Sequence, residues 1–207
     1  MKNLNCKAEE KESGIGTLIR PVSQMVEFYI SGHIGPAENY VQIFNQIRNL
    51  GELDFVKLHI NSYGGDLFTA IQFMRVLQES SATVICSVEG ACFSAATLIF
   101  LCGNEYEISH HSAFMFHNYS GVAVGKGGEM IDQLQHERKW SEKLLREAYN
   151  DFLTNEEIKS LLDNKDIWME AADVVSRLEK KSKVRKEPCA AEKAVKKRGK
   201  VKDPTSK

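Results

Sequence analysis

The chain has 207 residues, of which 43% are hydrophobic and 27% charged, and its formal net charge is −1. This balance is typical of globular proteins and excludes collagenous, disordered and disulfide-scaffold classes. No run of 18 apolar residues occurs and the first 14 residues are too polar for a signal peptide, so we expect a cytoplasmic protein without a membrane span. The five cysteines are scattered without CxxC spacing, which predicts reduced thiols.

The charge is unevenly distributed along the chain. Residues 179–207 hold 12 Lys and Arg against 4 Asp and Glu, a balance of +8, whereas residues 1–178 carry −9. The basic end is predicted to be a disordered tail, because it has too few apolar residues to offset the entropy of ordering. Residues 1–16 are predicted to be a mobile arm, which leaves one folded domain at 17–178. We expect the tail to be a solvated extension, with binding of nucleic acid or an acidic partner as the alternative.

Strand and helix patterns alternate through the first part of the folded domain. β-Branched and aromatic runs predict strands, and apolar residues spaced by three or four predict helices. In chain order the predicted elements are a strand at 26–30, a helix at 37–49, a strand at 55–60, a helix at 66–80, a strand at 83–88 and a helix at 94–102. Successive strand-turn-helix units predict an α/β fold with a parallel sheet.

The second part contains one unusually long helix. In chain order we expect strands at 105–108 and 113–117, a glycine-rich stretch, a helix at 129–153, a capped helix at 154–162, a connection at 163–168 and a last helix that ends near 178. The apolar stripe of the helix at 129–153 is too broken for a single core face. We therefore expect this helix to project from the body and to pack against another subunit.

The segment from Gly90 to Thr97 places a serine directly after a strand, at the N-terminus of a helix. Free N–H groups of the first helical turn and the positive end of the helix dipole stabilise an oxyanion there, which suits Ser94 as a nucleophile. The alternative is a serine that only caps the helix. The flanking Cys92 and Ala96 do not fit the G-x-S-x-G elbow of the α/β-hydrolases.

A glycine pair, Gly64-Gly65, lies at the carboxyl end of the preceding strand, where open α/β sheets bind ligands. One N–H group of this turn, together with the N–H of Ala95, would form an oxyanion hole with two donors. The alternative is a tight turn that only requires positive φ angles.

A nucleophilic serine needs a general base and a carboxylate that orients the base. His117 ends an apolar strand beside the glycine-rich stretch and is the preferred base, whereas the pair His110-His111 lies in a turn that we expect to be exposed. Asp166 is the preferred carboxylate, and Asp163 is nearly as well placed by spacing. A metal site at the histidines is the alternative, but no HExxH motif or third-ligand spacing accompanies them.

Four motifs of this chain, taken together, resemble those of the proteolytic subunit of the Clp protease (ClpP) family over about residues 22–175. They are, in order, Asn61-Ser-x-Gly64-Gly65, Gly90-x-x-x-Ser94, Met115-Phe-His117-Asn118 and Lys165-Asp166-x-Trp168-Met169. The resemblance implies a ClpP/crotonase-like α/β fold with repeated β-β-α units, a parallel-rich sheet and a projecting handle helix.

The same resemblance implies the roles of the site residues. Ser94 would be the nucleophile, His117 the general base and Asp166 its orienter, with the N–H groups of Gly64 and Ala95 as the oxyanion hole. No metal or organic cofactor is needed for this chemistry. The implied assembly is two stacked seven-membered rings that enclose the active sites, and an ATP-driven AAA+ unfoldase would deliver unfolded polypeptides.

This chain departs from the family pattern at several positions near the predicted site. Tyr63 stands where proline is usual, Asp66 and Phe93 stand where small residues are usual, and the basic tail is not a usual family feature. The departures remove no catalytic side chain. They indicate a phage-encoded or otherwise specialised relative, and a capsid maturation protease of the same fold is an alternative function.

Two further alternatives have a similar fold. An acyl-CoA enzyme of the crotonase type also holds an oxyanion with paired N–H groups but needs no Ser-His-Asp set. A non-catalytic ring subunit typically lacks members of the triad, whereas this chain keeps all three.

Overall fold

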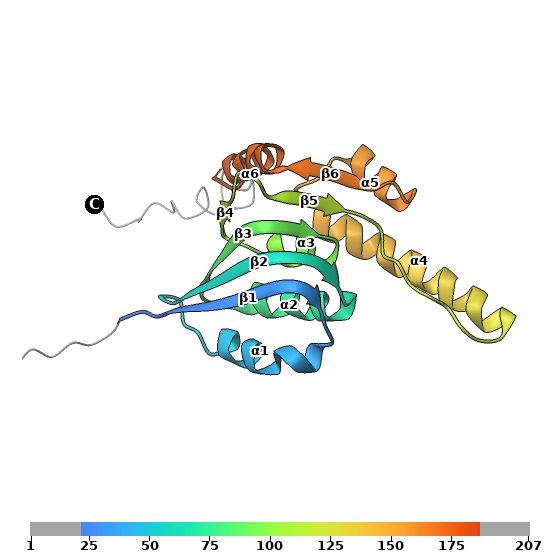
Figure 1. Ribbon diagram of the computed structural model, residues 1–207, viewed down its shortest axis with the longest axis horizontal. Helices are drawn as coiled ribbons and strands as arrows, with labels where there is room; N and C mark the ends of the chain where they lie inside the picture. Colours follow the sequence, from blue (N-terminus) through green and yellow to red (C-terminus); the bar gives the residue numbers. More distant parts are fainter. Residues whose placement is uncertain (1–21, 187–207) are drawn as a thin grey trace, which may run out of the picture.

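The molecule is built around one mixed β-sheet. The computed structural model describes residues 22–186. The strands lie in the order β1-β2-β3-β5-β6, with β4 paired to β3 (Figure 1). Their bounds are Met25–Ile34 for β1, Phe55–Gly65 for β2, Thr83–Phe93 for β3, Glu105–Ile108 for β4, Ala113–Phe116 for β5 and Ile167–Glu170 for β6. All pairs are parallel except β5 with β6. The predicted α/β fold with a parallel-rich sheet is confirmed.

Helices α1 to α3 cover one face of this sheet (Figure 1). The helices are α1 at Val41–Arg48, preceded by a 3-10 turn at Ala37–Tyr40, α2 at Leu67–Glu79, α3 at Ala95–Phe100, α4 at Gly127–Tyr149, α5 at Asn155–Leu162 and α6 at Ala171–Lys186. Burial alternates along β2, where Val56, Leu58 and Ile60 are fully buried. A strand with one apolar side must bury that side, and the helices provide the cover.

Several elements differ from the sequence expectation. β1 continues to Ile34 and β3 to Phe93, beyond the expected ends at residues 30 and 88. β2 continues through the glycine pair instead of ending at residue 60, and the expected connection at 163–168 contains the start of β6. The last helix continues to Lys186, so residues 179–186 are helical and do not belong to a disordered tail. The expected mobile arm at 1–16 and the rest of the basic tail, at 187–207, lie outside the described residues.

Helix α4 projects from the body, as expected (Figure 1). Only Ser141, Leu145 and Tyr149, all in its C-terminal half, are buried. Apolar side chains such as Ile131 and Leu134 are exposed on its outer half. Within the described part of the chain, no helix combines the length and the apolar character needed to cross a membrane.

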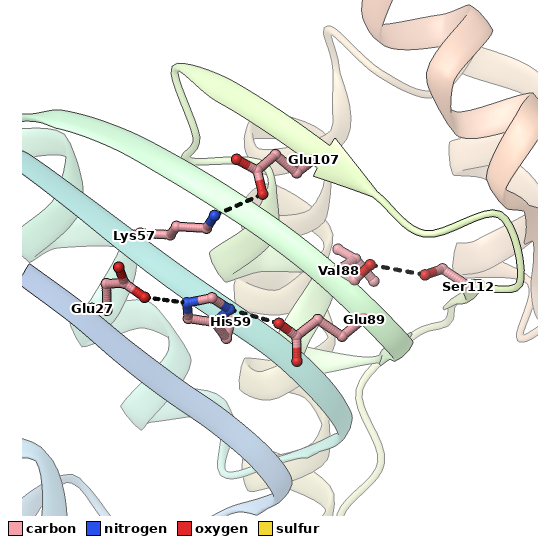
Figure 2. A network of polar contacts seen from close by, with 7 residues as sticks. All are labelled: Glu27, Lys57, His59, Val88, Glu89, Glu107 and Ser112. Atoms are coloured by element: carbon pink, nitrogen blue, oxygen red, sulfur yellow. Dashed lines mark hydrogen bonds and ion pairs between the residues drawn. The ribbon is translucent and has the colours of Figure 1, made fainter.

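The face of the sheet that is turned away from α1 to α3 carries a network of ion pairs across four strands (Figure 2). His59 on β2 lies between two carboxylates, with Nδ1 2.6 Å from Glu89 Oε1 and Nε2 2.8 Å from Glu27 Oε2. Lys57 Nζ lies 2.8 Å from Glu107 Oε2. Only 11% of the His59 side chain is exposed. These contacts link β1, β2, β3 and β4 through their side chains.

The stability of the protein is expected to depend on the protonation of His59. Burial opposes the charge on the imidazole, but the hydrogen bonds to Glu27 and Glu89 outweigh it and raise the pKa of His59. A raised folded-state pKa means that the contribution to stability is complete below the ordinary histidine pKa and is lost as pH rises through the folded value. We therefore expect His59→Gln to lower the melting temperature more at about pH 5.5 than at about pH 8.5.

The matched control is His110→Gln, because His110 lies exposed in a turn. His110→Gln removes no ion pair among the described residues, so we expect it to change the melting temperature little at either pH. An equal loss for His59→Gln at both pH values would contradict the proposed role of the imidazolium.

Candidate active site

Ser94 occupies the sharp turn between β3 and α3. Its backbone has φ 57° and ψ −127°, and α3 begins at the next residue, Ala95. A positive φ in a residue other than glycine costs about 1–3 kcal/mol and persists only where the surroundings impose it. One such constraint is the Ser94 N–H, which donates to the carbonyl oxygen of Met115 on β5 at 2.8 Å. The strained turn holds the serine at the carboxyl end of the sheet.

His117 follows β5 directly and contacts this serine. Its Nε2 lies 2.5 Å from Ser94 Oγ, and both residues are partly exposed. They lie in one pocket whose remaining lining residues are Gly65, Leu67, Ala95, Leu98, Asn118, Tyr119, Ser120, Ser141, Leu144, Leu145 and Tyr149. A hydroxyl in hydrogen-bond contact with an imidazole, and open to a pocket, can lose its proton to that imidazole as it attacks a substrate.

Asp166 lies opposite His117 in the continuation of the β5-β6 ladder. The last paired residues are Phe116 and Ile167, so the next step of the antiparallel register brings His117 and Asp166 together. The Asp166 side chain is nevertheless exposed, and within residues 22–186 it makes no hydrogen bond or ion pair with His117. Asp163 caps the C-terminal end of α5, and three residues separate it from Ile167, the first paired residue of β6.

The glycine pair lies against Ser94, but the N–H group of its first member is already engaged. The Gly64 N–H, which was the expected oxyanion donor, donates instead to Ser62 Oγ at 3.1 Å, and the Asp66 N–H donates to the Ile34 carbonyl oxygen on β1 at 2.8 Å. Gly65 lines the Ser94 pocket.

A chain of two hydrogen bonds holds the backbone carbonyl group of Ser94 in place. Thr97 Oγ1 donates to the Ser94 carbonyl oxygen at 2.6 Å, and Tyr149 Oη lies 2.7 Å from Thr97 Oγ1. Because the Thr97 hydroxyl has only one proton, Tyr149 must be the donor in the second bond. Burial raises the pKa of Tyr149 far above its usual range, which keeps the phenol protonated as this role requires. Tyr149 thereby ties the end of α4 to the Ser94 turn.

The other candidate groups near Ser94 are placed differently. Cys92 is fully buried on the core side of β3, and burial raises the pKa of its thiol well above the usual value. A buried thiol of this kind is inert as a nucleophile. The pair His110-His111 is exposed, as expected. Among the residues that the structure describes, no three His, Cys, Asp or Glu side chains are grouped as a metal site would require.

The sequence argument did not identify Thr97 or Tyr149 as parts of the site, and within the glycine pair it named Gly64 as the donor. Thr97 and Tyr149 are 52 positions apart, so only the packing of α4 on α3 brings their hydroxyl groups together.

One comparison with known protein families gave a match that covers most of the described residues. A family model described as Clp protease matches residues 24–177, from the start of β1 into α6. The matched segment contains Ser94, His117 and Asp166. A search of curated proteins found no match.

Proposed function

We propose that this chain, which belongs to the Clp protease family, is a serine endopeptidase. In the proposed mechanism Ser94 is the nucleophile and His117 is the general base. Members of this family are peptidases. The single observation that carries the proposal is the contact of 2.5 Å between Ser94 Oγ and His117 Nε2 at the mouth of a pocket. The positive φ of Ser94 supports it, because strained residues cluster at active sites.

The proposed reaction is acyl transfer in two steps. Ser94 Oγ attacks the peptide carbonyl carbon while its proton passes to His117 Nε2, and the imidazolium then protonates the leaving amine. Water next attacks the acyl-enzyme, and His117 takes a proton from that water and returns it to Ser94. Asp166 would hold the imidazole tautomer if its carboxylate turned toward His117, which the register of β5 and β6 favours.

We assign the oxyanion hole to the N–H groups of Ala95 and Gly65. Ala95 is the first residue of α3, and the first N–H groups of a helix have no partner within it. Gly65 replaces Gly64 in this role because the Gly64 N–H is donated to Ser62. Two fixed donors beside the attacked carbonyl stabilise the charge that develops in the transition state.

The proposed substrates are unfolded polypeptides, and the proposed working form is an oligomeric chamber. Members of this family generally form rings, and two stacked seven-membered rings are the assembly that we propose here. The exposed apolar residues at the outer half of α4 and before it support a contact between subunits; they are Val122, Val124, Ile131 and Leu134. The sequence contains no P-loop, so an AAA+ unfoldase would supply the ATP-driven step.

A fluorophosphonate probe tests the proposed nucleophile. We expect the probe to add to Ser94 in the full-length protein and not in Ser94→Ala, as measured by mass spectrometry of the tryptic peptides. The matched control is Ser120→Ala, because Ser120 is another serine of the same pocket, whereas the described hydrogen bond to His117 comes from Ser94. Full labelling of the Ser94→Ala variant, or no labelling of the unaltered protein, would contradict the proposed function.

A further inference from the structure

A second cavity adjoins the Ser94 pocket and has no role in the proposed reaction. Its volume is about 540 Å³, and it lies between the start of α2 and the middle of α4. Four residues line both spaces: Gly65, Leu67, Tyr119 and Ser120. A polypeptide whose scissile bond lies at Ser94 can therefore place a neighbouring side chain in this cavity.

Aromatic rings form one wall of the cavity. Phe68 from α2 and Trp140 from α4 stack with their ring centroids 5.4 Å apart and an interplanar angle of 26°. Phe68 is 70% exposed although it is a large apolar side chain. The rings offer flat apolar surface to the methylene stem of a long side chain, and their faces attract a cation.

Carboxylates provide the charge of the same cavity. Asp66, Glu137 and the imidazole of His136 line it, and among the described residues no Lys or Arg does. Asp66 uses one oxygen, Oδ1, to cap α2 through the Thr69 N–H at 2.7 Å, which leaves its second oxygen available. Glu137 Oε1 accepts a hydrogen bond from Gln133 Nε2 at 2.7 Å. Burial and the negative charge of Glu137 together raise the pKa of Tyr119, which lies between the two cavities.

We infer that this cavity binds a lysine or arginine side chain of the polypeptide substrate, next to the residue whose bond is cleaved. The stem lies on Phe68 and Trp140, and the cationic end is held by the carboxylates of Asp66 and Glu137. An acidic side chain at the same substrate position is repelled by these carboxylates. The inference rests on the proposed peptidase function and adds a substrate class to it.

The test uses a set of quenched-fluorescence peptides with one position varied at a time on each side of the cleaved bond. At each position lysine, arginine, norleucine and glutamate are compared by kcat/KM, because norleucine keeps the stem and removes the charge. At one position we expect lysine and arginine to exceed norleucine by about tenfold and glutamate to fall below it. This preference should decrease as salt is raised, because the cavity is open to solvent.

Variants of the cavity test the assigned residues. Asp66→Asn keeps an oxygen that can cap α2, and together with Glu137→Gln it should bring the lysine to norleucine ratio close to one. Glu137→Lys should reverse the preference between lysine and glutamate. The matched control is Glu142→Gln, because Glu142 is also an α4 carboxylate but pairs with Arg146 outside the cavity; its ratio should equal that of the unaltered protein.

The outcomes separate this inference from the function on which it rests. Cleavage of all peptides with no preference for lysine at any position would overturn the inference and leave the peptidase function standing. A preference that persists in the Asp66→Asn, Glu137→Gln double variant would also overturn it. Absence of both peptide cleavage and probe labelling at Ser94 would overturn the proposed function and the inference together.

Discussion

Replacement of Ser94 by alanine is expected to lower peptide turnover by about 10⁴-fold or more, because no other group can form the acyl-enzyme. Cys92, the nearest thiol in the chain, is buried with a raised pKa and cannot substitute. The folded state should be almost unaffected. Alanine keeps the Cβ atom, so the strain at φ 57° is the same in both proteins, and within residues 22–186 the lost hydroxyl makes a hydrogen bond only with His117.

His117→Ala is expected to reduce turnover to a similar extent, and the double variant to lose little more. Groups that act as one catalytic unit are strongly non-additive, so the two losses should not multiply. Turnover is measured with a short fluorogenic peptide at fixed protein concentration, and Ser120→Ala serves as the matched control from the same pocket. Multiplicative losses for Ser94→Ala and His117→Ala would show that the two side chains do not act as one unit.

The sequence carried enough information to place the strands and helices, because their patterns are local. Alternation in the run that becomes β2 and the three- to four-residue spacing in α2 follow from one buried face per element, whereas β3 is a continuous apolar run because residues 84–88 are buried on both faces. Ser94 was recognisable as a candidate because a serine directly after a strand and at the start of a helix lies beside free N–H groups, although a serine that only caps the helix fits the same pattern. His117 was preferred as its base from its place at the end of an apolar strand, and the family resemblance implied the same pair, although 23 residues separate the two in the chain.

The features that the sequence did not reveal depend on register or on long-range packing. β6 has only four residues, and its identity as a strand comes from pairing with β5. The engagement of the Gly64 N–H by Ser62 Oγ depends on the conformation of the turn, which no sequence pattern specifies. The cavity between Asp66 and Trp140 forms only when α4 packs across the start of α2, so no local pattern could have indicated it.

Replacement of Gly65 by alanine is expected to cause the largest loss of stability among single changes near the site. Gly65 has φ 150°, and a Cβ atom there would lie 2.2 Å from the Ile34 carbonyl oxygen and 2.8 Å from the Ile34 nitrogen. These are backbone atoms of β1, and Ile34 also accepts the hydrogen bond from the Asp66 N–H. The strand would have to separate from β2 at the edge of the active site. We expect a loss of about 3 kcal/mol or more in the free energy of unfolding.

Gly32→Ala provides the matched control for Gly65→Ala, because it isolates the cost of the backbone angle. Gly32 also lies on the β1-β2 edge with a positive φ of 69°, but a Cβ atom there meets nothing within 4 Å. Its loss should be about 1 kcal/mol. Both variants are compared by denaturant unfolding at one protein concentration. If Gly65 supplies the proposed oxyanion donor, the peptidase activity of Gly65→Ala should fall further than its folded fraction. If both variants lose the same free energy of unfolding, β1 moves easily to make room for the added methyl group. The close contact with Ile34 would then not be what requires glycine at position 65.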